Sequence, residues 1–327
     1  MKIFFYDLRP YDELPAVEKI SRETGIEFGY CEEYPTMDNY QLAEGGIGIS
    51  TTPCDLSAPI LERFASIGVK YILCRSIGYD HVDLVRAEEL GMRVSNVDYP
   101  PSGVANYTIM LMLMCARKIT HILQRADLQD YTLKGKIGRD ISFATIGVIG
   151  TGRIGATVIR HLSTFGCRIL CYDPYPNEET AKLAEYVDLD TLFSESEFIT
   201  VHTNATEENH HLLNKAAFEK MKDGVTIINT ARGKLVNTAD LIEALKSGRV
   251  GAAALDVLEK EDGLYYHDRS QDAIANDEMA ILRSFPNVIL SPHTAFYTYR
   301  AIDHMVRGNF EGALAFEKGE DSRHTIL

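Results

Sequence analysis

The chain has 327 residues, of which 45% are apolar and 24% are charged, and its net charge at pH 7 is −14. A single hydrophobic core stops growing at about 250–300 residues, so this length favours two domains. The acidic balance argues against nucleic acid and anionic membranes as partners. The longest apolar run, residues 107–116, is too short to span a bilayer.

The first positions alternate into charged residues, which is typical of a strand and not of a signal peptide. Six cysteines occur without a CxxC pair, and most lie in apolar stretches. Such cysteines are typical of reduced thiols in the cytoplasm, so we expect a cytoplasmic protein without disulfides.

The first hundred residues alternate between short apolar stretches and helical patterns. The helical patterns at residues 59–67 and 84–90 are each followed by a glycine, Gly68 and Gly91, which is typical of a helix end. This alternation predicts a parallel sheet covered by helices on both faces. The expected strands are Ile3–Tyr6, Ile26–Tyr30, Ile47–Ser50, Lys70–Cys74 and Arg93–Val97.

The prolines Pro100 and Pro101 interrupt this alternation, and we expect a hinge at residues 99–101. The strongly apolar stretch Val104–Ile119 predicts a helix that belongs to a core or to a subunit interface. The polar residues 127–142 are expected to form a loop.

A second and more regular series begins at Thr145 and fits a doubly wound dinucleotide-binding sheet. Within it, the sequence predicts a helix capped by Thr238 and ended by Gly248. The last stretch, residues 300–317, has one apolar helical face that we expect to return to the first domain. The expected strands are Thr145–Ile149, Arg168–Tyr172, Phe198–Val201, Val225–Asn229, Ala252–Leu255 and Asn287–Leu290.

A GxGxxG motif, formed by Gly150, Gly152 and Gly155, directly follows the first strand of this series. Its glycines permit a tight turn and a close approach of the backbone to a pyrophosphate at the following helix N-terminus. The motif alone is a weak signal, and Asp173 alone is equally well a turn residue before Pro174. Together they favour NAD over NADP, because a carboxylate after the second strand binds the ribose hydroxyls and repels a 2′-phosphate.

Ligands of open α/β sheets bind at the carboxyl ends of the strands. Arg232 follows a buried strand by three residues and can bind a carboxylate through two hydrogen bonds, although a single arginine is more often a surface residue. His293 can donate a proton to a carbonyl oxygen, with Glu261 as its orienting partner, although a single histidine is more often structural. The polar residues at the successive strand ends are His202, Arg232, Asp256 and His293, after Gly150 and Asp173.

His202, His210 and His211 have no ligand spacing to nearby cysteines or aspartates, so the sequence predicts no metal site.

Five motifs in this order resemble the D-isomer-specific 2-hydroxyacid dehydrogenase family over essentially the whole chain. Within the family, the chain is similar to D-lactate dehydrogenases, including the type associated with vancomycin resistance. The motifs are RSIGYDHVD (Arg75–Asp83), GTGRIG (Gly150–Gly155), NTARG (Asn229–Gly233), ALDVLEKE (Ala254–Glu261) and PNVILSPHTA (Pro286–Ala295).

The resemblance implies roles for individual residues. Arg232 corresponds to the substrate-binding arginine, His293 to the proton donor and Glu261 to the acid that binds this histidine. The substrate pocket would also include the backbone N–H groups of Ile77 and Gly78 and the side chains of Tyr99 and Phe296. The cofactor site would comprise Gly150, Gly152, Arg153, Ile154, Gly155, Asp173, His202, Thr230, Ala231 and Asp256. Two positions depart from the family pattern: Asn204 stands where the family usually has proline, and Phe296 stands where close D-lactate enzymes commonly carry tyrosine.

The fold class expected on this basis is α/β with two doubly wound parallel-sheet domains. The Rossmann cofactor domain, residues 101–298, would be inserted into a flavodoxin-like substrate domain formed by residues 1–100 and 299–327. The resemblance also implies a homodimer, to which the helix at residues 104–119 would contribute.

The expected activity is the NAD-dependent reduction of a small 2-oxo acid, with pyruvate as first choice, to the D-2-hydroxy acid. Hydride would pass between the nicotinamide and the substrate carbon, with His293 as acid and base. Branched or aromatic 2-oxo acids are the alternative substrates. An NAD-sensing binding protein on the same fold is the alternative from another class.

Overall fold

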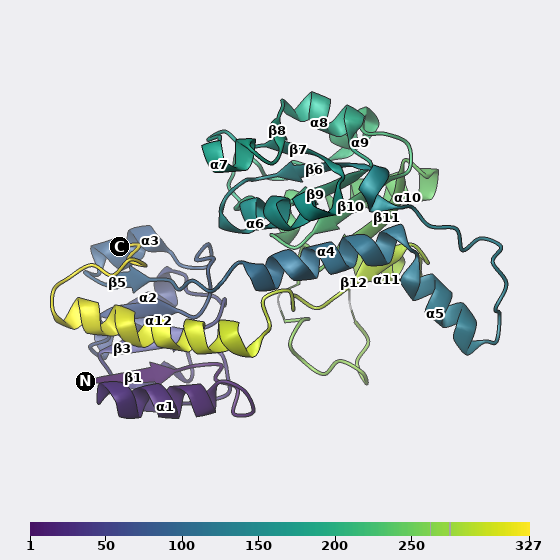
Figure 1. Ribbon diagram of the computed structural model, residues 1–327. Coiled ribbons are helices and arrows are strands. Elements are labelled where there is room, and N and C mark those ends of the chain that lie inside the picture. The colour runs from purple at the N-terminus through teal and green to yellow at the C-terminus, as the bar shows by residue number, and fades with distance from the viewer. Residues whose placement is uncertain (262, 275) are drawn as a thin grey trace. The chain divides into compact units, whose positions relative to one another are not determined.

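The computed structural model describes residues 1–261, 263–274 and 276–327, which divide into two compact units. Unit 1 contains Met1–Pro100 and Tyr297–Leu327, and unit 2 contains Pro101–Phe296. The chain leaves unit 1 at the proline pair and returns after Phe296, so unit 1 is discontinuous in sequence (Figure 1).

Unit 1 is built on a five-stranded sheet with the order β2-β1-β3-β4-β5, in which all neighbouring strands are parallel. This is the flavodoxin-like strand order. Each strand lies within two residues of its predicted position. The strands are β1 (Lys2–Phe5), β2 (Glu27–Tyr30), β3 (Gly48–Thr51), β4 (Tyr71–Cys74) and β5 (Arg93–Ser95).

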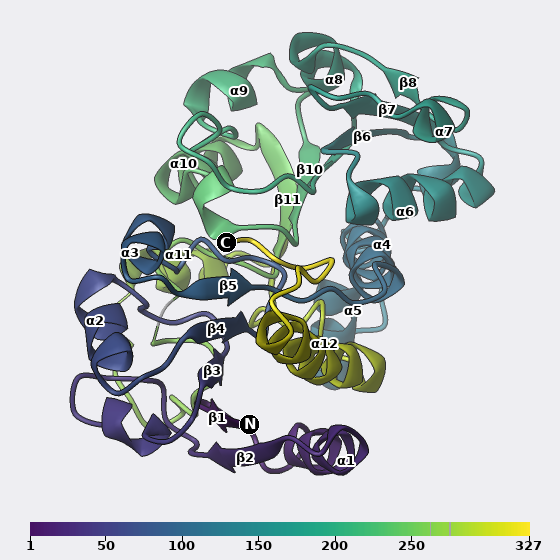
Figure 2. The same cartoon turned by 90° about the vertical axis from the view of Figure 1, so that its left-hand side faces the viewer.

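Helices cover both faces of this sheet (Figure 2). On one face, α1 (Leu14–Thr24) and α12 (Tyr299–Glu317) bury Val17, Ile20 and Phe310 against the strands. On the other face, α2 (Ala58–Ser66) and α3 (Leu84–Glu89) bury Ile60 and Phe64. A short 3-10 helix, η1, spans Tyr40–Ala43.

Unit 2 contains a seven-stranded parallel sheet with the order β12-β11-β10-β9-β6-β7-β8. Six of these strands were predicted. The seventh, β8, is a two-residue edge strand that is too short to show an apolar pattern. The strands are β6 (Thr145–Ile149), β7 (Arg168–Tyr172), β8 (Glu185–Tyr186), β9 (Phe198–Val201), β10 (Val225–Asn229), β11 (Val250–Leu255) and β12 (Val288–Leu290).

Two layers of helices cover this second sheet, each with its own apolar core. The first layer comprises α4 (Ser102–Ala116) and α6 (Arg153–Leu162). The second layer comprises α8 (Leu189–Glu195), α9 (Lys215–Lys220), α10 (Thr238–Ser247) and α11 (Asp277–Ser284). The remaining elements are α5 (Ile119–Asp127), α7 (Glu178–Ala181), η2 (Ile141–Phe143), η3 (Ser163–Phe165) and η4 (Gly233–Leu235).

Two helix boundaries differ from the prediction. The apolar helix α4 ends at Ala116 and not at residue 119, because Lys118 adopts a left-handed conformation with φ 51° and starts α5 in a new direction. The cap of α10 is Asn237 and not Thr238, since the Asn237 side chain accepts a hydrogen bond from the Asp240 N–H. Among the described residues, no helix combines the length and apolar character needed to cross a membrane.

Candidate active site

The glycine motif forms the tight turn between β6 and α6. Gly150 has φ 92°, and a Cβ atom there would lie 2.7 Å from the His202 carbonyl oxygen. At Gly155, a Cβ atom would lie 1.9 Å from the Gly150 carbonyl oxygen. Gly152 instead faces open space and caps α6 without a side chain, so the helix N-terminus is accessible. This arrangement fits a pyrophosphate bound by the backbone N–H groups of the helix.

Asp173 lies at the end of the neighbouring strand β7, and its carboxylate is oriented by the backbone. Its Oδ2 accepts the Thr151 N–H at 2.7 Å, and its Oδ1 accepts the Tyr175 N–H at 2.9 Å. Each carboxylate oxygen keeps a further lone pair for a ribose hydroxyl. The strand β8 supports the same turn, because the Tyr186 hydroxyl donates to Thr151 Oγ1 at 2.7 Å.

His202 follows β9 and adjoins Gly150. Its Nε2 lies 2.9 Å from Thr200 Oγ1, and burial lowers the pKa of His202 to about 3. The ring is therefore neutral at pH 7 and does not serve as a proton donor in the manner of an imidazolium. Its place beside the glycine turn fits a wall of the nucleotide site.

Arg232 lies in a turn that the side chain of Asn229 folds. The Asn229 amide accepts the Ala231 N–H at 3.0 Å and donates to the Arg232 carbonyl at 2.9 Å, while Arg232 Nη1 donates to the Ala231 carbonyl at 2.8 Å. The next residue, Gly233, has no room for a side chain, because a Cβ atom would lie 2.1 Å from the Leu258 carbonyl. The turn of Arg232 is thus packed against the segment that leads to Glu261.

His293 and Glu261 form a direct pair. His293 Nδ1 lies 2.6 Å from Glu261 Oε1, and Glu261 Oε2 accepts the Leu258 N–H at 2.8 Å. His293 also has φ 52°, a left-handed conformation that is uncommon for residues other than glycine. Since Glu261 takes the Nδ1 side of the ring, Nε2 is the nitrogen that remains for a substrate.

Asp256 holds the loop that carries His293. Its side chain is fully buried and accepts hydrogen bonds from Ser291 Oγ at 2.5 Å, the Thr294 N–H at 3.0 Å and the Ala295 N–H at 2.8 Å. Its backbone carbonyl accepts the His293 N–H at 2.7 Å. The sequence did not predict this anchoring of residues 291–295.

In unit 1, Ile77 and Gly78 lie in a turn after β4. Ser76 Oγ donates to the Gly78 carbonyl at 2.6 Å, and Asn96 Nδ2 donates to the Ile77 carbonyl at 2.7 Å. In the part of the chain that the structure describes, the N–H groups of Ile77 and Gly78 have no protein acceptor. Two such N–H groups can bind a carboxylate. Tyr99 lies in the same unit, half-buried, just before the proline pair.

Comparison with known proteins decides the family. Residues 109–295 match the model described as D-isomer specific 2-hydroxyacid dehydrogenase, NAD binding domain. The chain belongs to the D-isomer specific 2-hydroxyacid dehydrogenase family. It is therefore an NAD-dependent D-2-hydroxyacid dehydrogenase with the two parallel-sheet domains of that family.

Individual relatives of this dehydrogenase carry different substrate names. It is 39% identical to the D-lactate dehydrogenase of Escherichia coli, with all of both chains covered. It is 38% identical to the aromatic 2-oxoacid reductase of Clostridium sporogenes, with 97% of this chain and 96% of the relative covered. Among solved structures, a D-2-hydroxyisocaproate dehydrogenase matches with a TM-score of 0.89 at 31% identity, covering 100% of this chain and 99% of the other.

The dehydrogenase also has a cluster of His210, His211 and Glu259, whose donor atoms lie within 4.8 Å of one another. Sequence spacing did not indicate it, since Glu259 is distant along the chain. Hydrogen bonds account for it: His211 Nε2 lies 2.7 Å from Glu259 Oε1, and Asn237 Nδ2 lies 3.1 Å from His211 Nδ1. Glu259 Oε2 also accepts both the N–H and the hydroxyl of Thr238. We read the cluster as an anchor for the start of α10 and assign it no metal.

Proposed function

We propose that this dehydrogenase reduces pyruvate to D-lactate with His293 as the general acid. The observation that carries the proposal is the 2.6 Å contact between His293 Nδ1 and Glu261, in a loop that Asp256 anchors. A carboxylate at Nδ1 orients the ring, which leaves Nε2 to donate a proton to the substrate oxygen.

NAD, when bound in its reduced form, supplies the hydride. We assign its binding to unit 2, for which the sequence predicted the bounds 101–298, and substrate binding to unit 1, for which it predicted residues 1–100 and 299–327. The glycine turn fits the cofactor, because it leaves space at Gly152 and an accessible helix N-terminus. The residues that would hold it are Gly150, Gly152, Arg153, Ile154, Gly155, Asp173, His202, Thr230 and Ala231. Asp256, which the sequence also assigned to this site, is fully buried and would act only by anchoring residues 291–295.

Each substrate group has a corresponding protein group. Arg232 binds the carboxylate and polarises the carbonyl, and the Ile77 and Gly78 N–H groups bind the carboxylate. Tyr99 and Phe296 line the space for the side chain at the substrate carbon. His293 then transfers a proton to the carbonyl oxygen.

The test follows NADH consumption with pyruvate and resolves the enantiomer of the product. We expect turnover and D-lactate. NADH binding without turnover of pyruvate, 2-oxoisocaproate or phenylpyruvate would instead support an NAD-sensing binding protein.

Aromatic or branched 2-oxo acids are a second candidate, which Phe296 favours. Its ring lies edge-on to His293, with 6.3 Å between ring centroids, and brings no hydroxyl to the histidine. An apolar substrate side chain packs well against such a ring. Ranking kcat/KM for pyruvate, 2-oxoisocaproate and phenylpyruvate separates the two candidates, and Phe296→Tyr should shift the ranking toward pyruvate.

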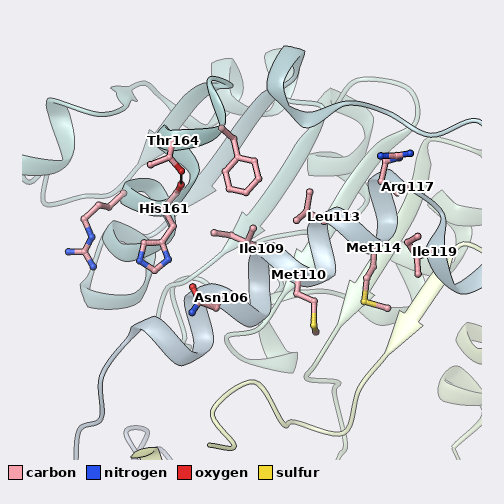
Figure 3. Close-up of a pocket in the computed structure, with 11 residues that line it drawn as sticks. Asn106, Ile109, Met110, Leu113, Met114, Arg117, Ile119, His161 and Thr164 are labelled. Atoms are coloured by element: carbon pink, nitrogen blue, oxygen red, sulfur yellow. Dashed lines mark hydrogen bonds between the residues drawn. The ribbon is translucent and has the colours of Figure 1, made fainter.

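We also propose a homodimer formed by unit 2. An open groove of about 870 Å³ lies between α4–α5 on one side and α6–η3 on the other (Figure 3). Its apolar lining includes Ile109, Met110, Leu113 and Met114 of α4. The segment after α5 is also unusually apolar for an exposed one, with Leu128, Tyr131, Leu133, Ile137 and Phe143 between 73% and 89% exposed. Apolar surface of this extent is typical of a protein interface, and a second copy would cover it.

A further inference from the structure

One turn of α4 contacts the loop that carries Arg232. Thr108 of α4 is fully buried, and its Oγ1 lies 2.8 Å from Oγ1 of Thr230, two residues before Arg232. The other buried residues of α4, such as Val104, Ile109 and Met112, are apolar or alanine. Burying a hydroxyl group costs free energy unless the group is hydrogen-bonded. The contacts of Thr108 with Thr230 and with the helix backbone offset this cost.

The same turn contacts the loop that carries His293. The hydroxyl of Tyr107 lies 3.1 Å from Oγ1 of Thr294, the residue that follows His293. The Thr294 N–H is itself bound by Asp256. Asp256 thus holds the backbone of Thr294, and α4 holds its side chain. The helix α4 packs against β10, β11 and β12.

We propose that Tyr107 and Thr108 are positioning residues, which hold the Arg232 and His293 loops in the geometry that 2-oxo acid reduction requires. The proposal rests on the proposed function. Neither residue touches the reacting atoms; each acts through a threonine of the adjoining loop.

The direction of one hydrogen bond follows from the geometry. Thr108 Oγ1 also lies 2.9 Å from the Val104 carbonyl, which can only accept, so the single hydroxyl hydrogen of Thr108 is directed there. Thr230 must therefore donate to Thr108. The hydroxyl of Thr230 then offers only lone pairs to a bound molecule and matches a donor such as a carboxamide NH₂ group.

The kinetic test uses near-isosteric variants. Thr108→Val keeps the volume and removes the hydroxyl, so we expect the KM for the 2-oxo acid to rise roughly 3- to 10-fold, with a smaller change in kcat. Thr108→Ser should restore the wild-type KM. Tyr107→Phe should lower kcat roughly 3- to 10-fold with little change in KM, because it loosens the loop of the proton donor. Tyr299→Phe, at a 94% exposed tyrosine, is the matched control.

Amide hydrogen exchange without cofactor or substrate gives a readout that does not depend on activity. We expect faster exchange at residues 229–233 in Thr108→Val and at residues 291–295 in Tyr107→Phe. Unchanged exchange in both variants, or kinetic changes no larger than those of Tyr299→Phe, would overturn the proposal. A wild-type protein that reduces no 2-oxo acid would refute the proposed function, and the exchange data would still decide whether α4 holds the loops.

Discussion

The proposed chemistry depends, among single residues, on the Nδ1 nitrogen of His293 and the carboxylate of Glu261. Their contact is short, and the left-handed backbone at His293 shows that the surrounding loop holds the ring in one place. The sequence predicted the pair from the position of His293 after a strand and from the family motifs. It did not predict Asp256 as the anchor of the loop, because hydrogen bonds to backbone N–H groups leave no trace in residue spacing.

His293→Ala should lower kcat roughly 10²- to 10⁴-fold, the range for a lost general acid, and leave NADH binding intact. Glu261→Gln should lower kcat and leave NADH binding intact, because the ring of His293 loses the carboxylate that orients it. The measurements are pH–rate profiles and NADH titration by fluorescence. His210→Ala, at an exposed histidine of unit 2, is the control. An unchanged kcat in Glu261→Gln would show that Glu261 does not orient the proton donor.

The pKa of His202, lowered to about 3 by burial, predicts a pH dependence of stability. Between about pH 6.5 and pH 3 the unfolded chain binds a proton at this histidine that the folded chain does not, so stability falls as the pH decreases through this window. His202→Asn removes this contribution. We therefore expect the Tm of the variant to fall less than that of the wild type between about pH 7.5 and pH 5. Equal decreases in Tm would contradict the assignment, and His210→Asn serves as the control.

Among the elements, the β6–α6 turn and the neighbouring strand end form the part of the site that we propose for the nucleotide. The glycine spacing predicted this turn, since Gly150 and Gly155 stand where no side chain has room. The support from Tyr186 on β8 was not predicted, because a two-residue strand has no periodicity.

Asp173→Asn should reduce the preference for NADH over NADPH. The change removes the charge that repels a 2′-phosphate and weakens charge-assisted hydrogen bonds, so the ratio of the two kcat/KM values should fall roughly 10- to 100-fold. The comparison is made with both cofactors at the same ionic strength. Asp190→Asn, on the surface of α8, is the control. A wild-type enzyme that uses both cofactors equally would refute the placement of this carboxylate.

At the scale of the whole molecule, the chain forms two compact units joined by two short crossings, at Pro100–Pro101 and at Phe296–Tyr297. The proline pair in the sequence predicted the first of these two crossings. The apolar character of α4 left two interpretations open, a core helix or a subunit interface. In the structure, one side of α4 packs in the core and another lines the groove that we propose as the interface.

Met110→Glu should weaken the proposed dimer, because it places a charge in the apolar groove, where the residue is 41% exposed. We expect light scattering coupled to gel filtration to report a dimer for the wild type and a shift toward monomer for the variant. Leu42→Glu, at a 51% exposed leucine of unit 1, should remain dimeric. A monomeric wild type at micromolar concentration would refute the proposal.

Periodicity, glycine geometry and chain order are local properties, so the fold class, the glycine turn and the order of the residues at the strand ends could be predicted from the sequence. Contacts that no motif indicates required the folded chain. The contact between Asp256 and the Thr294 N–H joins residues 38 positions apart, and that between Thr108 and Thr230 joins residues 122 positions apart. Such contacts depend on the register of the strands and on how the helices pack over them, and both arise only when the chain is folded.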